Sequence, residues 1–332
     1  MADSLLFLVP WSVHRISYNE FMILVAGSAN LDFVVRAPRI PAPGETVLGT
    51  SFHTFAGGKG ANQAIACARA GGVATSMLLG LGRDSFAEPI EASLNEAGVV
   101  LHVVRAGDLP TGTAFICVSD DAENAITVAP GANAALRAEH LPDLSGVAYL
   151  MLQLETPLAT VAAYAAAARK AGVQVVLNAA PPHALPPDLL TLVDVLVVNE
   201  GELASISNCT GSVAECLAQL PDMPCIVVTL GGRGCCARLK GQIILQPAFA
   251  VTPIDTTAAG DTFCGVLVAS LAQQHAMPLA IARACAAAAL ACTRCGAQDS
   301  IPSCAQVDLF LAHQSLDATA NAALARFVGF NS

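Results

Sequence analysis

Two acidic residues flank a group of small residues in the stretch DTTAAGDTFCG, which runs from Asp255 to Gly265. The small residues at 258–260 lead into an apolar run typical of a helix, and the free N–H groups at a helix start attract anions. Such groups can stabilise a phosphoryl group as charge develops on it. Asp261 can take the proton of an attacking hydroxyl there, although it could also merely cap the helix. Asp255 is better placed for structure or for a cation.

A second stretch suited to ligand binding is GGKGANQA, residues 57–64, which precedes a helical run. Paired glycines let the backbone approach a ligand closely, and the helix start offers N–H groups to polar or anionic atoms. The stretch is not a P-loop, because Lys59 is followed by Gly60 and not by Ser or Thr. We therefore interpret it as a ligand-binding turn of another kind.

Polar residues also follow strand-like runs, which is where ligands of open α/β sheets bind. Asn30 and Asp32 are spaced so that an extended backbone puts both side chains on one face, able to grip neighbouring hydroxyls. A turn with a helix cap is the alternative for this pair. Glu155 lies just before Pro157 at the start of a helical run, where it can bind a hydroxyl or favour the helix dipole.

Two later stretches leave a structural and a functional interpretation open. Asn199 suits a helix N-cap with Glu202 as its capping-box partner, and we favour this over a pair that orders metal-bound water around phosphates. The glycines of TLGGRG, residues 229–234, permit a nucleotide to lie against the backbone. A tight hairpin turn would need the same glycines.

Apolar strand-like runs alternate with Ala-rich helical runs from Met22 onward. The runs at 23–26, 148–152, 173–177, 193–198 and 225–230 are continuous, as in strands that are covered on both faces. Helical stretches such as 157–171 are long enough for right-handed crossovers. The sequence therefore predicts an α/β fold with a doubly wound, mostly parallel sheet flanked by helices.

The domain organisation follows from the segments that break this rhythm. Residues 33–56 and 110–128 indicate short strands and turns, from which we infer a small β-sheet lid. Residues 1–21 precede the first core strand and are interpreted as an extension or a misplaced start. The main domain is expected over 22–313, and residues 314–332 are expected to form a surplus C-terminal segment with a helix.

Composition excludes several classes of partner. The net charge of −10 and the lack of a Lys/Arg cluster argue against nucleic acid, and no apolar run reaches the length of a membrane span. Because no export signal is evident, we expect a cytoplasmic protein whose 12 cysteines are free thiols. Cys292 and Cys295 form a C-x-x-C that could bind zinc or cycle as a dithiol, but no second pair completes it, and a structural role is favoured.

Taken together, GGKGANQA and DTTAAGDTF resemble the two signatures of the PfkB family of carbohydrate kinases, closest to its ribose-phosphorylating members. The resemblance runs from about Met22 to Leu311 and includes PAPGETVLG, PGANAAL, LQLETP, VNEGE, TLGGRG and TRCGAQ in the family order. It implies transfer of the ATP γ-phosphoryl group to O5 of D-ribose, with Mg²⁺ accompanying ATP. A kinase for another sugar or a nucleoside, and a sugar-binding regulator without catalysis, remain alternatives.

The resemblance also implies roles for individual residues. Asp261 matches the catalytic base, and Ala258, Ala259 and Gly260 match the anion hole beside it. Ribose contacts are implied for Asn30, Asp32, Gly58, Lys59, Asn62, Glu155 and Asp261. Nucleotide, phosphate and magnesium positions are implied for Asn199, Glu202, Thr229, Gly231, Gly232, Gly234 and Gly260, with Cys285 near the adenine.

Two further properties are implied by the resemblance alone. A monovalent-cation site, usually for potassium, would use the side chains of Asp255 and Ser300 and the carbonyls of Thr257, Ala291, Arg294 and Gly296. The lid strands would pair across a two-fold axis, which gives a homodimer. The chain departs from the family at Cys285, where a polar residue such as His is common, and at Cys264, where Asn is common. These departures concern nucleotide affinity.

Overall fold

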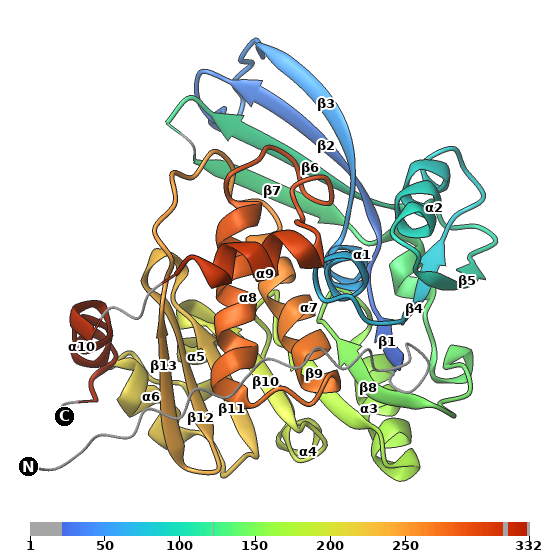
Figure 1. Cartoon of the computed structure of the whole chain (residues 1–332). Coiled ribbons are helices and arrows are strands. Elements are labelled where there is room, and N and C mark those ends of the chain that lie inside the picture. The colour runs from blue at the N-terminus through green and yellow to red at the C-terminus, as the bar shows by residue number, and fades with distance from the viewer. Residues whose placement is uncertain (1–21, 122, 315–317, 331–332) are drawn as a thin grey trace, which may run out of the picture.

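The computed structural model describes residues 22–121, 123–314 and 318–330, which form two sheets with helices around the larger one (Figure 1). The larger sheet has nine strands in the order β13-β12-β11-β10-β9-β8-β1-β4-β5. All of its pairs are parallel except β11 with β12 and β12 with β13, so the predicted mostly parallel sheet is confirmed. The predicted N-terminal extension lies outside the described residues.

The strands of the large sheet include every run predicted from the sequence. In chain order they are β1 (Met22–Ala26), β4 (Thr75–Leu81), β5 (Val100–Arg105), β8 (Val147–Leu152), β9 (Gln174–Asn178), β10 (Val195–Asn199), β11 (Cys225–Thr229), β12 (Gly234–Leu239) and β13 (Gln242–Pro247). The strands β4, β5, β12 and β13 were not predicted. The antiparallel hairpin of β12 and β13 forms one edge of the sheet, and β5 forms the other.

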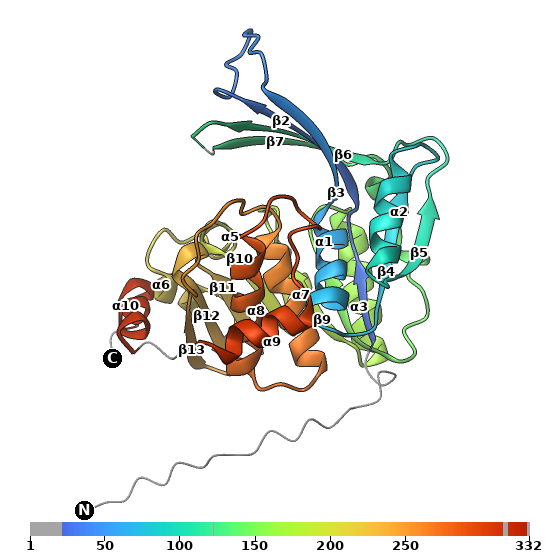
Figure 2. The same ribbon diagram turned by 45° about the horizontal axis from the view of Figure 1, so that its top comes forward.

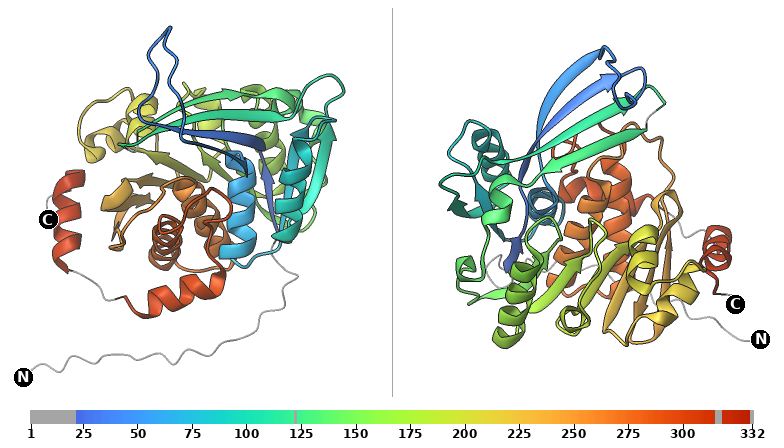
Figure 3. Two further views of the ribbon diagram at one scale, coloured as in Figure 1. Left: turned by 90° about the horizontal axis from the view of Figure 1, so that it is seen from above. Right: turned by 180° about the vertical axis from the view of Figure 1, so that it is seen from behind.

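Helices pack on both faces of this sheet, as Figure 3 shows. One face is covered by α1 (Lys59–Ile65), α2 (Ala87–Glu96), α7 (Ala259–Ala272), α8 (Met277–Ala291) and α9 (Cys304–Ala312). The other is covered by α3 (Leu158–Ala171), α4 (Pro187–Leu190), α5 (Glu200–Ser207), α6 (Val213–Gln219) and α10 (Ala318–Val328). The two resulting cores confirm the doubly wound arrangement. Among the described residues, no helix is long and apolar enough to cross a membrane.

A separate sheet of four strands projects from one side of the α/β body (Figure 2). It has the order β3-β2-β6-β7 and is built from β2 (Asn30–Ala37), β3 (Ser51–Gly57), β6 (Gly112–Ser119) and β7 (Asn124–Ala129). Only β2 and β6 run parallel. These strands occupy the predicted lid segments, except that β2 begins earlier, at Asn30, and that β3 and β7 each end one residue later.

Candidate active site

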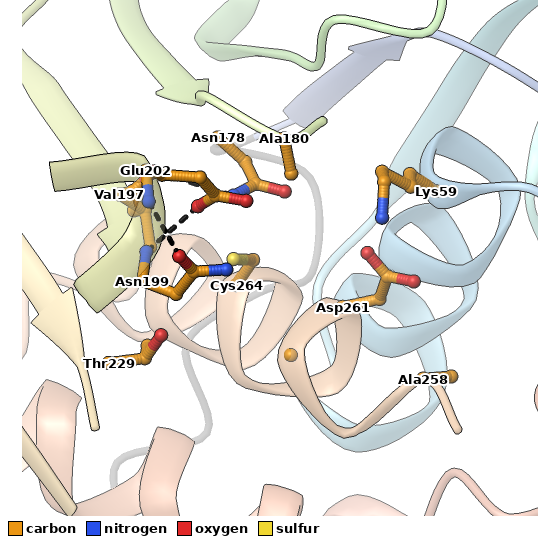
Figure 4. Close-up of a pocket in the computed structure, with 11 residues that line it drawn as sticks. Lys59, Asn178, Ala180, Val197, Asn199, Glu202, Thr229, Ala258, Asp261 and Cys264 are labelled. Atoms are coloured by element: carbon orange, nitrogen blue, oxygen red, sulfur yellow. Dashed lines mark hydrogen bonds between the residues drawn. The ribbon is translucent and has the colours of Figure 1, made fainter. Parts of the chain in front are cut away.

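The candidate site lies where the carboxyl ends of the central strands meet the N-termini of α1, α5 and α7. A cavity of about 190 Å³ opens there (Figure 4). It is lined by Lys59, Asn178, Ala180, Val197, Asn199, Glu202, Thr229, Ala258, Gly260, Asp261 and Cys264. The topology therefore brings together four stretches that the sequence analysis treated separately, which are 57–64, 199–202, 229–234 and 255–265.

Asp261 lies in the first turn of α7, at the edge of this cavity. Ala258 precedes the helix with a left-handed φ of 58°, and no side chain caps the helix start. The carboxylate of Asp261 instead accepts one hydrogen bond from Asn62 Nδ2 and one from Gln63 Nε2, each 2.9 Å long. The helix-cap alternative for Asp261 is therefore wrong, and its carboxylate faces the ligand side of the helix.

The start of α7 leaves backbone donors beside this carboxylate. The N–H of Ala259 donates to the carbonyl of Thr256 at 3.2 Å, and the N–H of Thr262 donates to the carbonyl of Ala258 at 2.8 Å. The amides of Gly260 and Asp261 lie between these two donors, in the turn where a helix has no intrahelical acceptors for its N–H groups. This is a suitable place for a phosphoryl group.

Lys59 brings a positive charge to the same cavity, and its ammonium group points towards Asp261 (Figure 4). Burial opposes the charged form, but the carboxylates of Asp261, Glu155 and Glu202 outweigh burial and raise the pKa of Lys59 above its ordinary value. The side chain is thus a fixed cation among carboxylates. It can attract a polyphosphate into the cavity and partly neutralise the carboxylates that line it.

Asn30 and Asp32 are buried at the start of β2, on the lid side of the site. Asn30 Oδ1 accepts a 2.8 Å hydrogen bond from Asn133 Nδ2, which fixes the amide. Burial, followed by the charges of Glu155 and Asp261, raises the pKa of Asp32 to about 7. The turn-and-cap alternative for the pair is wrong, because both residues belong to a strand. Their side chains form a polar patch suited to hydroxyls.

The glycine pair of GGKGANQA allows a close approach at this patch. A Cβ on Gly57 would lie 2.1 Å from Asp32 Oδ2, and one on Gly58 would lie 2.7 Å from the backbone of Ala29. Gly58 also has a φ of +90°, which side chains disfavour. A side chain at Gly57 would displace the Asp32 carboxylate, and one at Gly58 would press on the backbone of Ala29 and Asn30, so the motif is needed for the local structure as well as for any ligand.

Glu155 is held beside the same turn. One of its carboxylate oxygens accepts hydrogen bonds from Ser28 Oγ at 2.6 Å and from the backbone N–H of Lys59 at 3.3 Å. Pro157 is the N-cap of α3, so Glu155 lies outside the helix and not in its first turn. This geometry favours the hydroxyl-binding interpretation over the helix-dipole one. The helix begins at Leu158, one residue later than expected.

Asn199 and Glu202 form the predicted capping box at the start of α5. The N–H of Glu202 donates to Asn199 Oδ1, and the N–H of Asn199 donates to Glu202 Oε2, both at 2.8 Å. Both side chains also line the cavity opposite Lys59, so the structural and functional interpretations are compatible. Burial raises the pKa of Glu202, although the Asn199 hydrogen bond opposes this.

The stretch 229–234 joins two antiparallel strands and is the tight turn that the sequence allowed. The N–H of Leu230 donates to the carbonyl of Gly234 at 2.8 Å, while Gly231 and Gly232 face open space. Thr229 lines the cavity, so the turn borders the site. Cys285 does not line the cavity, and its sulfur lies 3.7 Å from that of Cys235.

Cys264 lines the cavity from α7, one turn beyond the catalytic candidate. Burial, with the nearby charges of Asp261 and Glu202, raises the pKa of its thiol well above the ordinary value. The thiol is therefore neutral near pH 7 and contributes a small, weakly polar surface to the cavity.

Asp255 ties together the two segments predicted to hold a monovalent cation. Its carboxylate accepts hydrogen bonds from the N–H and hydroxyl of Thr257, at 2.9 and 2.6 Å, and from the N–H of Gly296 at 3.0 Å. Burial alone would raise the pKa of Asp255, but these bonds outweigh it and lower the pKa. The backbone of Asp255 also donates to the carbonyl of Cys292. The two segments are therefore adjacent.

The other predicted cation ligands belong to the segment 291–300, which contacts Asp255 through Cys292 and Gly296. Ser300 is fully buried and its hydroxyl donates to the carbonyl of Ala297 at 2.8 Å, while the carbonyl of Ala291 accepts from the N–H of Arg294. Within the described residues there is no group of three or more His, Cys, Asp or Glu that could hold a metal ion. Any cation here would therefore depend chiefly on backbone and hydroxyl oxygens.

Several buried amide side chains near the site were not predicted. These are Gln63, Gln153, Asn178 and Gln298. Gln63 stands inside GGKGANQA, and Asn178 ends a strand-like run, so each had a usable signal in the sequence. Gln153 follows the strand-like run 148–152 and Gln298 ends the stretch TRCGAQ, but nothing local indicated their roles, because their partners are distant in the chain.

The fold and site are those of a known class. Residues 20–304 match the family described as pfkB family carbohydrate kinase, and the chain belongs to this family. Among its relatives, ribokinase from Haemophilus influenzae is 36% identical over 302 residues, which are 88% of this chain and 98% of that protein. Ribokinase from Schizosaccharomyces pombe is 35% identical, over 86% of this chain and 96% of that protein.

Solved structures agree with this assignment. Ribokinase from Thermotoga maritima aligns with a TM-score of 0.80 at 32% identity, covering 88% of this chain and 100% of that chain. Ribokinase from Arabidopsis thaliana, solved with ribose and ATP, aligns with a TM-score of 0.79 at 31% identity, covering 88% and 99%. The similarity therefore extends over essentially the whole length of these four relatives.

Proposed function

We propose that the chain transfers the γ-phosphoryl group of ATP to O5 of D-ribose, giving D-ribose 5-phosphate and ADP. The observation that carries this proposal is the position of Asp261. Its carboxylate is held at the start of α7, between the hydroxyl-binding patch of Asn30 and Asp32 and the cavity that contains Glu202. A base in this position lies between an alcohol and a phosphoryl donor.

The sugar occupies the lid side of the site in this proposal. Asn30, Asp32 and Glu155 accept or donate hydrogen bonds to its hydroxyls, and the turn at Gly58 approaches it with backbone groups. Asn62 and Lys59 complete the contacts. A small polyhydroxyl ring suits this set better than a nucleoside, whose base would need an apolar or aromatic slot.

The nucleotide occupies the cavity side. The turn at 229–234 borders the nucleoside, and the amides of Gly260 and Asp261 receive the transferring phosphoryl group, which Lys59 attracts. Mg²⁺ supplies positive charge to the phosphates, and oxygen ligands suit it. Glu202 and Asn199 are the oxygen-bearing side chains that would hold it, through water. Asp261 takes the hydroxyl proton, so positioning and electrostatics account for most of the catalysis.

A monovalent cation, for which potassium is our choice, belongs to the junction of Asp255 with Gly296. The oxygen-rich surroundings and the ionised Asp255 carboxylate suit such an ion. When bound, it supplies a fixed positive charge near the anion hole and thereby favours negative charge there.

The small sheet serves as the lid and as the dimer interface in this proposal. Phe52 and Phe115 lie on one face of the small sheet and are 57% and 54% exposed, so apolar surface on this face is uncovered in a single copy. A second copy of the chain would cover this face and the sheet edges. Lid closure over ribose would exclude water and limit ATP hydrolysis. We place the enzyme in the cytoplasm, where ATP is available and its free thiols stay reduced.

The test is ADP release from Mg-ATP by the purified chain with ribose, deoxyribose, fructose or adenosine, each in potassium and in sodium. Turnover is expected on ribose and is expected to rise in potassium. Turnover on adenosine or fructose alone would reject the ribose assignment but keep the kinase. Folded protein that is silent with every acceptor would instead favour a sugar-binding regulator.

A further inference from the structure

Both oxygens of the Asp261 carboxylate are held by consecutive residues of α1. Oδ1 accepts from Gln63 Nε2 and Oδ2 accepts from Asn62 Nδ2, each at 2.9 Å. Gln63 is fully buried and Asn62 is 6% exposed, so water does not replace these donors. An amide has a donor end and an acceptor end of nearly the same shape, and only the donor end can stabilise a carboxylate. Something must therefore fix which end faces Asp261.

A second layer of amides fixes this orientation on both sides. Gln153 Nε2 donates to Gln63 Oε1 at 2.5 Å, which leaves the Gln63 amino group to donate to Asp261 and, at 3.0 Å, to Asn178 Oδ1. Gln298 Nε2 donates to Asn62 Oδ1 at 3.2 Å, which leaves the Asn62 amino group for the same carboxylate. Gln63 and Asn62 thus each accept a hydrogen bond from the second layer of amides and donate one to the Asp261 carboxylate.

Gln298 is itself anchored at both its side chain and its backbone. Ser93 Oγ donates to Gln298 Oε1 at 2.6 Å, and Arg69 Nη1 donates to the Gln298 carbonyl at 2.8 Å. The side chain is 3% exposed. Hydrogen bonds that run in one direction along such a chain polarise one another, so the donor that reaches the carboxylate is strengthened.

The charges that surround Asp261 explain why its carboxylate needs to be held in place. Asp32 and Glu155 add negative charge on the sugar side of Asp261, and Lys59 is a cation that could pull the carboxylate out of position. A base must keep one oxygen aimed at the hydroxyl within hydrogen-bond reach. Anchoring each oxygen from behind, on the buried side of α1, meets this requirement.

We propose that Gln63 and Gln298 are positioning residues for phosphoryl transfer, Gln63 by holding the Asp261 carboxylate directly and Gln298 by holding Asn62. This inference rests on the proposed function only in naming the reaction that the carboxylate serves. The orientation of the carboxylate itself does not depend on the acceptor.

The experiment compares Gln63→Met and Gln298→Met with Gln273→Met as a matched control. Gln273 follows the far end of α7 and donates to the carbonyl of Gly71 at 3.0 Å, so the control loses a similar bond away from the site. Steady-state kinetics with ribose and Mg-ATP, and thermal unfolding, are measured for all three. Met keeps the length of the side chain but removes its donor.

We expect Gln63→Met to lower kcat by about 10- to 100-fold, the range expected when a reacting group is misplaced by about 1 Å. The KM values for ribose and ATP should stay within about threefold of wild type, because a positioning group acts on the transition state. Gln298→Met should lower kcat less, because it acts through Asn62. Gln273→Met should leave kcat unchanged. If Gln63→Met does not fold, Gln298→Met still tests the inference, because Gln298 is not part of α1 and acts on Asp261 through Asn62.

Ligand-free crystal structures of Gln63→Met and Gln273→Met give the readout that is independent of substrate. The Asp261 carboxylate is expected to rotate in the first and to stay in place in the second. An unmoved carboxylate, or a kcat within about twofold of wild type in both folded site variants, would overturn the inference. If the wild type does not phosphorylate ribose, the proposed function fails, while the crystal structures still decide the inference.

Discussion

Asn62 and Asp261 are 199 residues apart in the chain and are joined by a 2.9 Å hydrogen bond from the amide to the carboxylate. The bond connects the start of α1 to the start of α7, two helices on the same face of the large sheet. Because both helix starts point to the carboxyl ends of the strands, the two family signatures meet at one point. The acid of DTTAAGDTF and the turn of GGKGANQA therefore form a single site.

The first prediction concerns the role of Asp261 as base. Asp261→Asn should lower kcat by about 10²- to 10⁴-fold, the contribution typical of a general base. Affinity for ribose should change little, because the other side chains proposed to bind its hydroxyls, Asn30, Asp32 and Glu155, are unchanged. ADP release and ribose binding are measured side by side, with Asp188→Asn, an exposed acid on α4, as the control. Near-normal turnover in Asp261→Asn would reject the base assignment.

The second prediction concerns the pH dependence of stability through Asp32. Its pKa is about 7 in the folded chain against an ordinary value of 3.8, chiefly through burial and then through Glu155. The folded state therefore binds the Asp32 proton more tightly than the unfolded state does. The contribution of Asp32 to stability is full below about pH 4 and is lost as the pH rises through about 7. The difference between these pKa values corresponds to at most about 4 kcal/mol.

Asp32→Asn removes this titration. Its free energy of unfolding, from urea denaturation, should exceed that of the wild type at pH 8, and this advantage should vanish at pH 4. The KM for ribose should rise, since an acceptor for hydroxyls is lost. An equal difference in stability at both pH values would show that Asp32 does not titrate in this range.

Much of the fold could be predicted because its strands are local signals. The runs of β8, β9, β10 and β11 are short, apolar and continuous, which is the pattern of a strand covered on both faces. The strand β4 has the same pattern and was within reach. The hairpin of β12 and β13 was not, because its Gln and Arg residues interrupt the apolar pattern at the sheet edge.

The site was predictable where one motif carried its own chemistry. Asp261, after a glycine at a helix start, is such a case. Gln153 and Gln298 stand in the quoted stretches LQLETP and TRCGAQ, but their roles were not predictable. These roles exist only through bonds to residues far away in the chain, such as the bond that joins Gln298 to Asn62 across 236 residues. Burial also changes the pKa of a residue, as it does for Asp32, and the sequence does not show burial directly.

The third prediction concerns the monovalent cation. Asp255→Asn should abolish the increase in turnover on replacing sodium by potassium, because the fixed negative charge that would hold the ion is removed. The matched control is Asp84→Asn, since Asp84 likewise accepts from the N–H and hydroxyl of one threonine, Thr111, at 2.8 and 2.7 Å. A potassium response that survives Asp255→Asn but not Asp84→Asn would move the cation elsewhere.

The fourth prediction concerns Mg²⁺ at the start of α5. Glu202→Gln keeps an oxygen for the capping box with Asn199 but removes a negative charge from the cavity. The Mg²⁺ concentration for half-maximal turnover should rise by about 10-fold or more, as for other groups that hold a metal through water. Glu215→Gln is the control, because Glu215 forms the same capping box with Ser212 at the start of α6 and is itself exposed. Equal Mg²⁺ responses in both variants would exclude Glu202 from the magnesium site.

The last prediction concerns α10, which lies beyond the residues that match the family model. Leu324 and Val328 bury α10 against the body, and Phe327 presents its ring to Arg233, whose guanidinium carbon lies 4.0 Å from the ring centroid. Arg233 also donates to Glu200 at 2.7 Å, so α10 helps to fix the turn at 229–234.

Loss of that contact should loosen the turn that borders the nucleotide. A cation–π contact at an exposed site contributes about 0.5–1 kcal/mol, so Phe327→Ala should raise the KM for ATP by about two- to fivefold. The KM for ribose should not change, because the proposed sugar site is on the lid side. Asn321→Ala, an exposed position of the same helix, controls for effects on α10 itself. A KM for ATP that is unchanged in Phe327→Ala would separate α10 from the nucleotide site and leave it only a packing role.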